Sequence, residues 1–194
     1  MNKVTISGIV RNNPVFSHMS GDMEMYKFEI EVLRTSGTID LLPCVCTKTI
    51  EESIVVGEVN TFDGFIYSRN TTVNNKKTCE TFFFANTKIE TLENGENSVN
   101  LRGFLCKKPI YRTTPLGREI TDFLIAVNRK NSKADYIHCI AWGVTASQLL
   151  EFNVGDEIVL KGRFQSRPYT KNIDGKTVTK LAYEVSASWV DLGV

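Results

Sequence analysis

Residue types and motifs that are typical of enzyme active sites are scarce in this chain of 194 residues. It contains only two histidines, His18 and His138, which lie in different halves. It has no phosphate-cradling glycine loop, no nucleophile elbow and no pair of carboxylates spaced for acid–base chemistry. Cys44 and Cys46 are separated by one residue, which is not the spacing of a zinc pair. We therefore expect no catalytic residue, no metal site and no cofactor.

Long apolar runs are also missing. No stretch approaches the length of a membrane span, and the opening MNKVTISGIV is too short and too polar for a secretory signal. The five cysteines are an odd number, and three of them lie inside apolar runs, which fits a reduced chain better than a disulfide framework. These absences predict a cytoplasmic protein with no membrane contact.

What the sequence does contain is an internal repeat. VTISGIVRNNPVF resembles VNLRGFLCKKPIY 95 residues later, and VGEVNTFDGFIYSR resembles VGDEIVLKGRFQSR at an offset of 98. So many positions in register predict two similar domains, residues 1–95 and 96–194, joined at ENGENS. The matched pairs include Gly8 with Gly103, Arg34 with Arg129, Asp40 with Asp135, Cys44 with Cys139, Gly64 with Gly162, and Arg69 with Arg167.

Each copy is mostly strand by pattern. In the second copy, five segments rich in β-branched and aromatic residues are separated by turn signals at 115–117, 128–133 and 174–175. The segment TASQLLEF, 145–152, has helical spacing and Thr145 as its expected N-cap, and KTIEESIVV is its counterpart in the first copy. Five strands with a short helix between the third and fourth predict an OB-fold, a small Greek-key barrel. The expected fold class is all-β, with two tandem OB-folds.

The stretch DYIHCIAWG, 135–143, has two different faces when it is read with the period of a strand. Ile137, Cys139 and Ala141 form an ordinary core face. The other face carries two aromatic rings and an imidazole: its members are Tyr136, His138, Ile140 and Trp142. Such rings on a strand that already has a core face indicate a binding surface, although half-buried sheet aromatics are also common in all-β proteins.

The second copy resembles the bacterial single-stranded-DNA-binding protein family. The resemblance is carried by NSVNLRGFL, by KKPIYRTTPLGREITDFLIAVNR, by DYIHCIAWG and by VGDEIVLKGRFQSRPYTKNIDGKTVTKLAYEV, which span nearly all of 97–194 in order. The first copy is similar more weakly, through its glycines, Pro14 and VGE…GFIYSR. The resemblance implies a barrel that holds single-stranded DNA, with four OB-folds as the working unit. A tandem chain would supply four as a homodimer.

Stacking residues follow from this resemblance and from the chemistry of the ligand. A non-specific binder needs aromatic platforms in a basic groove, each contributing about 1–3 kcal/mol. Tyr136 and Trp142 fall where the family has stacking aromatics on this strand, and Tyr169, in PYTKNIDGKT, falls where it has another. A further stacking position of the family falls near Asn131, which is not aromatic.

Charge separates the two copies. Residues 97–194 carry 14 basic and 9 acidic side chains, a net charge of +5, whereas 1–96 carry 9 and 13, a net charge of −4. Basic side chains near the expected binding face are reasonable phosphate contacts. The predicted contacts are Arg112, Arg118, Arg129, Lys130, Lys133, His138, Lys161, Arg163, Arg167 and Lys171. His138 is expected to contact phosphate or neighbouring polar groups rather than to act as a titrating switch.

The first copy lacks the same features. At the positions of Tyr136, Trp142 and Tyr169 it has Leu41, Thr47 and Thr71, so we predict a scaffold or dimerisation module. The apolar strip of Leu41, Pro43 and Val45 is then expected to pack against a loop, the other domain or a second subunit. The run FFF at 82–84 is interpreted as a buried strand or a subunit contact, because lysines flank only its ends. Trp189 is predicted to lie in the core of the second copy with Tyr183 and Val185.

The leading functional prediction is a non-catalytic, sequence-independent binder of single-stranded DNA, associated with the nucleoid. It would act in replication, repair, recombination or plasmid transfer, with other proteins of those processes as possible partners. An alternative is a primosome-like interaction module with weak DNA affinity, and RNA binding is a third possibility. The sequence ends at WVDLGV, without the flexible linker and acidic tip that are typical of the family, so partner recruitment would need another route.

Overall fold

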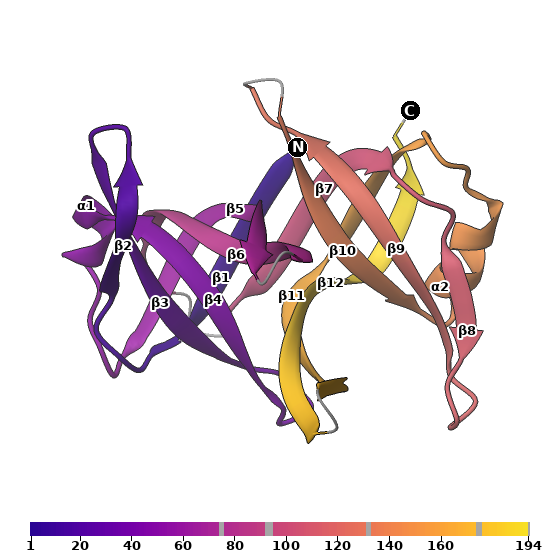
Figure 1. Ribbon diagram of the computed structural model, residues 1–194, viewed down its shortest axis with the longest axis horizontal. Helices are drawn as coiled ribbons and strands as arrows, with labels where there is room; N and C mark the ends of the chain where they lie inside the picture. The colour runs from indigo at the N-terminus through magenta and orange to yellow at the C-terminus, as the bar shows by residue number, and fades with distance from the viewer. Residues whose placement is uncertain (74–75, 92–94, 131–132, 174–175, 194) are drawn as a thin grey trace.

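The computed structural model describes residues 1–73, 76–91, 95–130, 133–173 and 176–193 of the chain (Figure 1). The predicted turn at 174–175 and the non-aromatic position Asn131 lie outside these ranges. Within them, no helix is both long enough and apolar enough to cross a membrane.

The two halves contain the same strands and α-helix in the same order, as the repeat predicts. Among the described residues, each half has six strands and a short helix between the fourth and fifth. In the first half these are β1 (Asn2–Val10), β2 (Val15–Ser20), β3 (Met23–Leu33), β4 (Ile39–Thr47), α1 (Lys48–Glu51), β5 (Val59–Val73) and β6 (Lys76–Ile89). In the second half they are β7 (Asn97–Leu105), β8 (Ile110–Thr113), β9 (Glu119–Asn128), β10 (Ala134–Trp142), α2 (Val144–Gln148), β11 (Glu157–Ile173) and β12 (Lys176–Leu192).

The helices differ in detail from the sequence prediction. The segment 145–152 is divided between α2 and a 3-10 turn, Leu149–Glu151. The residue that caps α2 is Gly143, at φ 56°, and Thr145 instead donates a hydrogen bond from its hydroxyl to the carbonyl of Ser188. The prediction of Thr145 as N-cap was therefore wrong. A glycine at positive φ lets the chain turn directly from β10 into the helix, which leaves Thr145 already inside it.

Five strands of each half close into a barrel, which confirms the predicted OB-folds. In the first half the ring of neighbours runs β1–β3–β4–β6–β5 and back to β1, with β4 and β6 parallel. The second half repeats it as β7–β9–β10–β12–β11, with β10 and β12 parallel. The sequence did not predict β2 and β8, two short strands that pair with β3 and β9 outside the rings.

Matched glycines of the repeat stand where barrel strands come closest. A Cβ on Gly8 would overlap the carbonyl oxygen of Glu31, where β1 meets β3. A Cβ on Gly64 would overlap the carbonyl oxygen of Phe84 beside a bulge in the β5–β6 pairing. Gly103 and Gly162 occupy the corresponding positions in the second half. These glycines are required because no side chain fits there.

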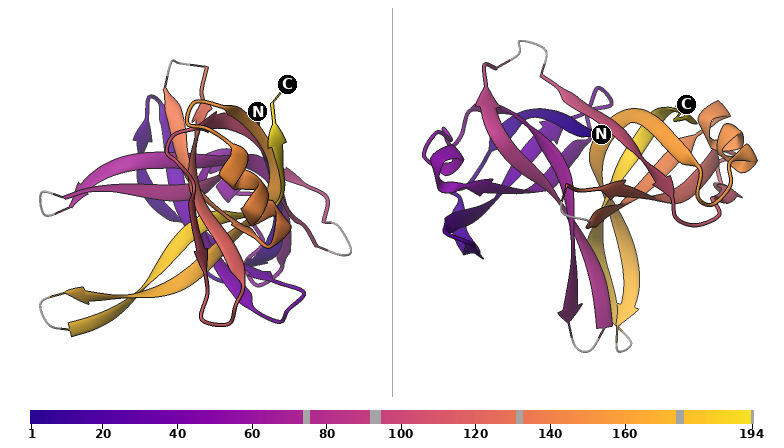
Figure 2. Two further views of the ribbon diagram at one scale, coloured as in Figure 1. Left: turned by 90° about the vertical axis from the view of Figure 1, so that its right-hand side faces the viewer. Right: turned by 90° about the horizontal axis from the view of Figure 1, so that it is seen from above.

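The barrels are joined edge to edge through their first strands. β1 and β7 pair antiparallel around Val4 opposite Val99, so a single twelve-stranded sheet runs through the molecule. The long hairpins β5–β6 and β11–β12 project from the same side of the molecule (Figure 2). The two barrels thus have a fixed relation, with their hairpins on a common side.

Two equivalent ion pairs clamp the halves together. Asp135 is paired with Arg129 and accepts a hydrogen bond from the Ser68 N–H of the first half at 2.6 Å. The Arg129 guanidinium also donates to the Ser68 carbonyl at 2.8 Å. We call these residues the Asp135 clamp.

The second clamp repeats this geometry with the halves exchanged. Asp40 is paired with Arg34 at 2.6 Å and accepts from the Ser166 N–H at 2.7 Å. The Arg34 guanidinium donates to the Ser166 carbonyl at 3.0 Å. We call this the Asp40 clamp. Both carboxylates are buried, so the clamps belong to the interior of the interface.

Candidate nucleic-acid interface

The two faces of β10 are largely as the sequence predicts. Ile137, Cys139 and Ala141 are buried in the core. On the opposite face Tyr136 and Trp142 are 43% and 39% exposed, and His138 is also exposed. Ile140 is an exception, because it is buried although it shares that face. The rings of Tyr136 and Trp142 are therefore open to solvent at opposite ends of the strand.

A large groove runs between the two halves on the side of the hairpins. It has a volume of about 880 Å³. From the second half it is lined by His138, Arg167 and Tyr169, and from the first half by Pro43 and by residues 78–82 of β6. We call this surface the interdomain groove. Neither Tyr136 nor Trp142 is among its described lining residues, although the thiol of Cys79, which lines it, contacts the Tyr136 carbonyl at 3.9 Å.

Tyr169 is the predicted stacking residue that lies in the groove. It stands on β11 opposite Lys180 of β12 and is 38% exposed. Tyr183, farther along β12, also lines the groove and is partly buried against the Phe164 ring, with centroids 6.4 Å apart. The hairpin therefore presents an aromatic platform beside a lysine, as base stacking next to a phosphate requires.

Three predicted phosphate contacts are engaged with carboxylates. Arg112 pairs with Asp122 at 2.8 Å. Arg167 makes a bidentate pair with the buried Glu184, with both N–O distances 3.0 Å. Arg129 is held in the Asp135 clamp. These partners orient the guanidinium groups and offset their charge, so they contribute less to attracting a polyanion than their number suggests.

The remaining predicted cations are freer. None of them forms an ion pair with a residue that the structure describes, and all are exposed. Lys161 lies over the Trp189 ring, 5.7 Å from its centroid. This group consists of Arg118, Lys130, Lys133, Lys161, Arg163 and Lys171.

Three further lysines line the groove, and the sequence analysis did not assign them to the site. Lys107 and Lys108 follow β7, and Lys180 faces Tyr169 across the hairpin. All three are exposed. The pair of lysines at 107–108 was visible in the sequence, but only the pairing of β11 with β12 places Lys180 next to an aromatic ring.

His138 lines the groove among charged groups. Partial burial against the groove walls lowers its pKa, and the nearby Lys107 lowers it further. Glu184 and Asp122 act in the opposite direction but more weakly. Although no carboxylate is close in sequence, two are close in space. The net effect favours a neutral imidazole in the free protein near pH 7.

The prediction that Trp189 lies in the core was wrong. The side chain is 44% exposed, whereas Val185 and Val190 are fully buried. The cause is a bulge: Gly162 of β11 faces Ala187, but the preceding Lys161 faces Trp189, so Ser188 is an extra residue in β12. A bulge of this kind exchanges the two faces of the strand from that point on. Trp189 is consequently turned to the outside, under Lys161.

The apolar strip of the first half is covered to different degrees. Val45 is buried, and Leu41 and Pro43 are half-buried. The Leu41 N–H donates to the hydroxyl of Ser166 in the second half at 3.3 Å, so the backbone of the strip contacts the other domain. The cover of its side chains stays a prediction.

The cysteines offer little to a metal ion. Cys44 and Cys46 both lie in the core of the first barrel. Burial raises the pKa of the Cys46 thiol to about 12, which disfavours the thiolate that metals bind. Among the described residues, no group of three or more His, Cys, Asp or Glu side chains is arranged to hold a metal ion.

These features define a class: an all-β protein of two OB-folds with an aromatic and basic groove between them. The profile of the Single-strand binding protein family matches residues 96–192, and the chain belongs to that family. The matched residues are those in which the sequence resembles it most strongly.

Named relatives agree with this assignment. A single-stranded DNA-binding protein of Oceanobacillus iheyensis is 38% identical over 89 residues, covering 42% of this chain and 55% of that protein. One of Fusobacterium nucleatum is 38% identical over 106 residues, covering 50% of this chain and 66% of that protein. The chain thus spans about half to two thirds of the length of these relatives.

A solved structure shows the same fold over the whole chain. The wild-type single-stranded DNA binding protein from Thermus aquaticus superposes with a TM-score of 0.78 and 18% sequence identity. The superposition covers 100% of this chain and 93% of that one. The arrangement of two joined barrels is therefore not peculiar to this sequence.

Proposed function

We propose that this protein binds single-stranded DNA without catalysis and without preference for base sequence. The observation that carries the proposal is the interdomain groove, which has a volume of about 880 Å³. Tyr169 and three lysines line it between the barrels. A single strand needs aromatic platforms for its bases and cations along its backbone, and the groove offers both. Family membership supports the same ligand.

The two halves contribute unequally in this proposal. Residues 96–194 are the principal DNA-binding domain, because Tyr136, Trp142 and Tyr169 belong to it and the net charge is positive. Residues 1–95 serve as a scaffold or dimerisation module and form the far wall of the groove through β6. Two chains associated as a homodimer would provide four OB-folds, which light scattering with and without a long oligonucleotide would measure.

The central test is titration of the full chain with oligothymidylate at low salt. Tyr169→Ala should weaken binding by about 5- to 150-fold, the range that corresponds to one stacking platform. Tyr111→Ala is a matched control, because Tyr111 is similarly exposed on β8 and is not among the described lining residues of the groove. Equal affinity of the wild type and Tyr169→Ala would count against the groove, and no binding at all would refute the function.

The same titration separates this function from an interaction module with weak DNA affinity. That alternative is favoured by the three arginines that are already paired with carboxylates, because their charge is offset and attracts DNA less. The double variant Tyr136→Ala/Trp142→Ala should lose affinity if these open rings stack on bases, and keep it if they contact other proteins. Competition by RNA of equal length tests the third possibility, RNA binding.

A biological setting follows from the ligand. A protein that coats single-stranded DNA would work with the nucleoid in the cytoplasm, in replication, repair, recombination or plasmid transfer. Proteins of those processes are then its expected partners. Its binding should weaken steeply with salt, with a slope of about −0.7 per phosphate contacted.

A further inference from the structure

The first half carries aromatic rings at positions of its last hairpin where the second half has none. Phe65 and Tyr67 alternate along β5, and Phe84 and Phe82 stand directly opposite them on β6. All four are half-buried, whereas Phe83 between them is fully buried in the core. Measured from the equivalent glycine bulges, the second half has Arg163, Gln165, Ser186 and Glu184 at these four positions. These four rings are therefore a feature of the β5–β6 hairpin that the β11–β12 hairpin does not repeat.

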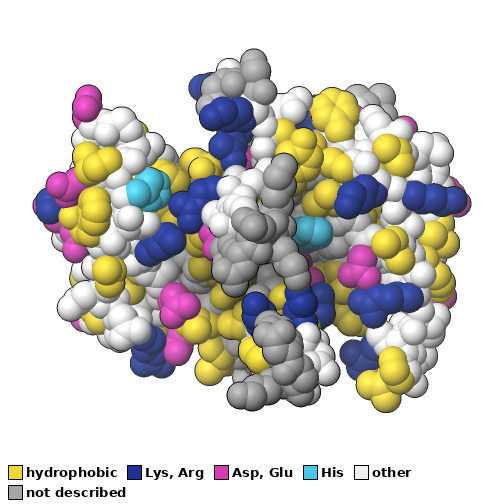
Figure 3. All heavy atoms as spheres, viewed as in Figure 1, with side chains coloured by type: hydrophobic (Ala, Val, Ile, Leu, Met, Phe, Trp, Pro, Cys, Tyr) yellow, Lys and Arg dark blue, Asp and Glu magenta, His cyan; other side chains and the backbone are white. Residues whose placement is uncertain are grey.

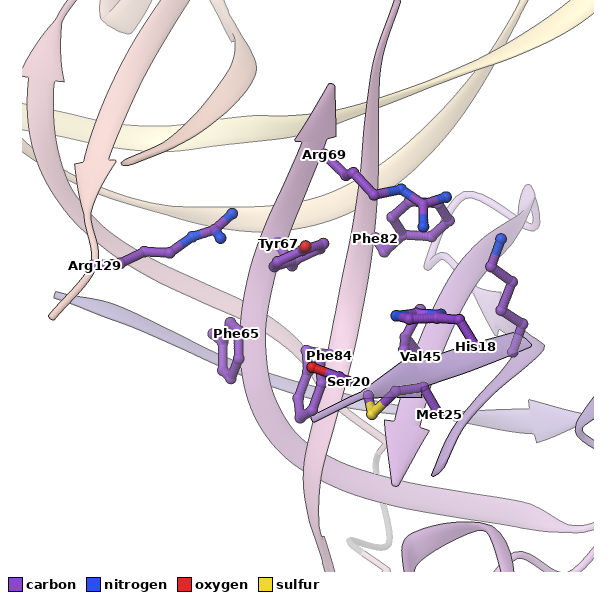
Figure 4. Close-up of a pocket in the computed structure, with 11 residues that line it drawn as sticks. His18, Ser20, Met25, Val45, Phe65, Tyr67, Arg69, Phe82, Phe84 and Arg129 are labelled. Atoms are coloured by element: carbon purple, nitrogen blue, oxygen red, sulfur yellow. The ribbon is translucent and has the colours of Figure 1, made fainter. Parts of the chain in front are cut away.

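These rings line a cleft of about 240 Å³, which we call the first-half cleft. Val45 of β4, Met25 of β3 and His18 of β2 complete its described walls together with several cations. Figure 4 shows Tyr67, Phe82 and Phe84 along one side and His18, Met25 and Val45 along the other. Phe65 and Phe84 are stacked, with centroids 4.8 Å apart and an interplanar angle of 12°.

Cations surround the rings although the half is acidic as a whole. Lys27 and Arg69 lie over Phe82, 5.3 and 5.7 Å from its centroid, and Arg129 of the second half lies 4.4 Å from that of Tyr67. Lys27 forms no ion pair with a described residue. These cations come from β3, β5 and the other domain, and so the flanks of the FFF run in the sequence did not reveal them.

Arg69 supplies a second indication that a ligand is accommodated. Its guanidinium pairs with Glu80 at 3.0 Å through one terminal nitrogen. Its Nε atom is buried and has no hydrogen-bond acceptor among the described residues. A buried donor without an acceptor is costly, and an ordered water or a bound ion would satisfy it. Because Nε itself is buried, an anion entering the cleft would meet the exposed remainder of the Arg69 side chain, which is 35% exposed.

The cleft and the interdomain groove share a lining residue, Phe82. Arg69 lies over the Phe82 ring and lines the cleft, and Thr81, which precedes Phe82 on β6, lines the groove. Both histidines of the chain are visible on one face of the molecule, His18 from the cleft and His138 from the groove (Figure 3). A strand lying in the groove can therefore extend onto the first half across Phe82 without turning to another face.

We propose that the first-half cleft is a second base-binding site for the same DNA strand. A nucleobase rests against the exposed parts of Tyr67 and Phe84, and Lys27 and Arg69 neutralise the adjoining phosphates. This site rests on the proposed function, and it assigns to the first half a direct contact with DNA in addition to its role as scaffold. It predicts that DNA long enough to span groove and cleft binds more tightly than DNA that fills the groove alone.

The test is a titration of wild type and Phe84→Leu with oligothymidylates of increasing length. Phe84 is chosen because it lines the cleft but not the groove. Short oligonucleotides should bind both proteins equally, whereas long ones should bind the variant about 5- to 150-fold more weakly. Lys27→Gln should reduce the salt slope for long oligonucleotides by about 0.7. Phe16→Leu is the matched control, because Phe16 is an exposed ring on β2 outside the cleft.

A second measurement needs no variant and covers the case in which Phe84→Leu fails to fold. The wild type is photocrosslinked to an oligonucleotide containing iodouracil, and the adducts are located by mass spectrometry. Adducts located on Tyr67 or Phe84, which line the cleft but not the groove, support the site. Adducts confined to the second half and to residues 78–82, or equal length dependence in wild type and Phe84→Leu, would overturn it. Neither result would affect the proposed function. That function fails if the wild type does not bind long oligothymidylate at all.

Discussion

The Asp135 clamp gives the most direct test of how the two barrels are joined. The carboxylate is buried and receives charge-assisted hydrogen bonds from Arg129 and one from the Ser68 N–H. Asp135→Ala would leave the Ser68 N–H without this acceptor and the Arg129 guanidinium without its carboxylate, although its bond to the Ser68 carbonyl would remain. Removing one partner of a buried pair costs about 3–5 kcal/mol. Because the Arg129 side chain is 23% exposed and can partly turn to water, we expect the lower end, about 3 kcal/mol.

Urea unfolding of the full chain measures this loss. Asp135→Asn keeps one acceptor for the Ser68 N–H but loses the charge, so it should cost about half as much. Asp22→Ala in the exposed β2–β3 turn is the control and should change stability by less than about 0.5 kcal/mol. If Asp135→Ala were no more destabilising than Asp22→Ala, the clamp would not stabilise the fold.

The Asp40 clamp extends the test to the coupling between halves. Asp40→Ala should cost a similar amount, since Asp40 is fully buried and accepts from Arg34 and Ser166. If the two clamps hold one interface, the double variant should lose less than the sum of the single losses, because the first break already loosens the second contact. Strict additivity would show that each clamp stabilises only its own surroundings.

Three other predictions concern single residues. Gly162→Ala should destabilise the second barrel strongly, because its Cβ would overlap the Ser186 carbonyl. Gly117→Ala, at a turn with open space, should show only the smaller strain that follows from its φ of 74°. Comparable melting temperatures of the two variants would contradict this. In Trp142→Phe, the remaining Trp189 should emit as a solvent-exposed indole and be quenched readily by acrylamide, and a blue-shifted, protected emission would refute the bulge geometry. Burial and Lys107 lower the pKa of His138 in the free protein, whereas a bound phosphate would raise it. Binding then takes up a proton, so DNA affinity should rise as pH falls from above the pKa of the bound imidazole to below that of the free one. His138→Gln should lack this rise, and an opposite trend in the wild type would argue against a phosphate near the ring.

The sequence predicted the fold well because the repeat and the strand pattern reinforce each other. The period-two pattern placed Ile137, Cys139 and Ala141 in the core and Tyr136 and Trp142 outside, and the structure agrees. Matched glycines marked the points of closest strand contact. These features depend on local geometry, which a sequence records directly.

The site was less predictable because it depends on which residues face one another across paired strands. Arg112, Arg129 and Arg167 are assigned to phosphate by sequence alone, yet each is paired with a carboxylate 6 to 17 residues further along the chain. Lys180 reaches Tyr169 only through the hairpin register. The placement of Trp189 failed for a related reason, since one extra residue at Ser188 reverses the faces of β12 and leaves no mark in its composition.

The repeat can also be used as an internal comparison between the two halves. Arg34 and Arg129, and Asp40 and Asp135, are identical in the two copies and have the same role twice, because each pair clamps a serine of the other half. Tyr67 and Phe82 of the first half differ from their counterparts Gln165 and Glu184, which are buried and hydrogen-bonded to each other. The same two positions therefore carry rings that line the cleft in one half and a buried polar pair in the other. The two barrels would then share one architecture while presenting different platforms to successive parts of a single strand.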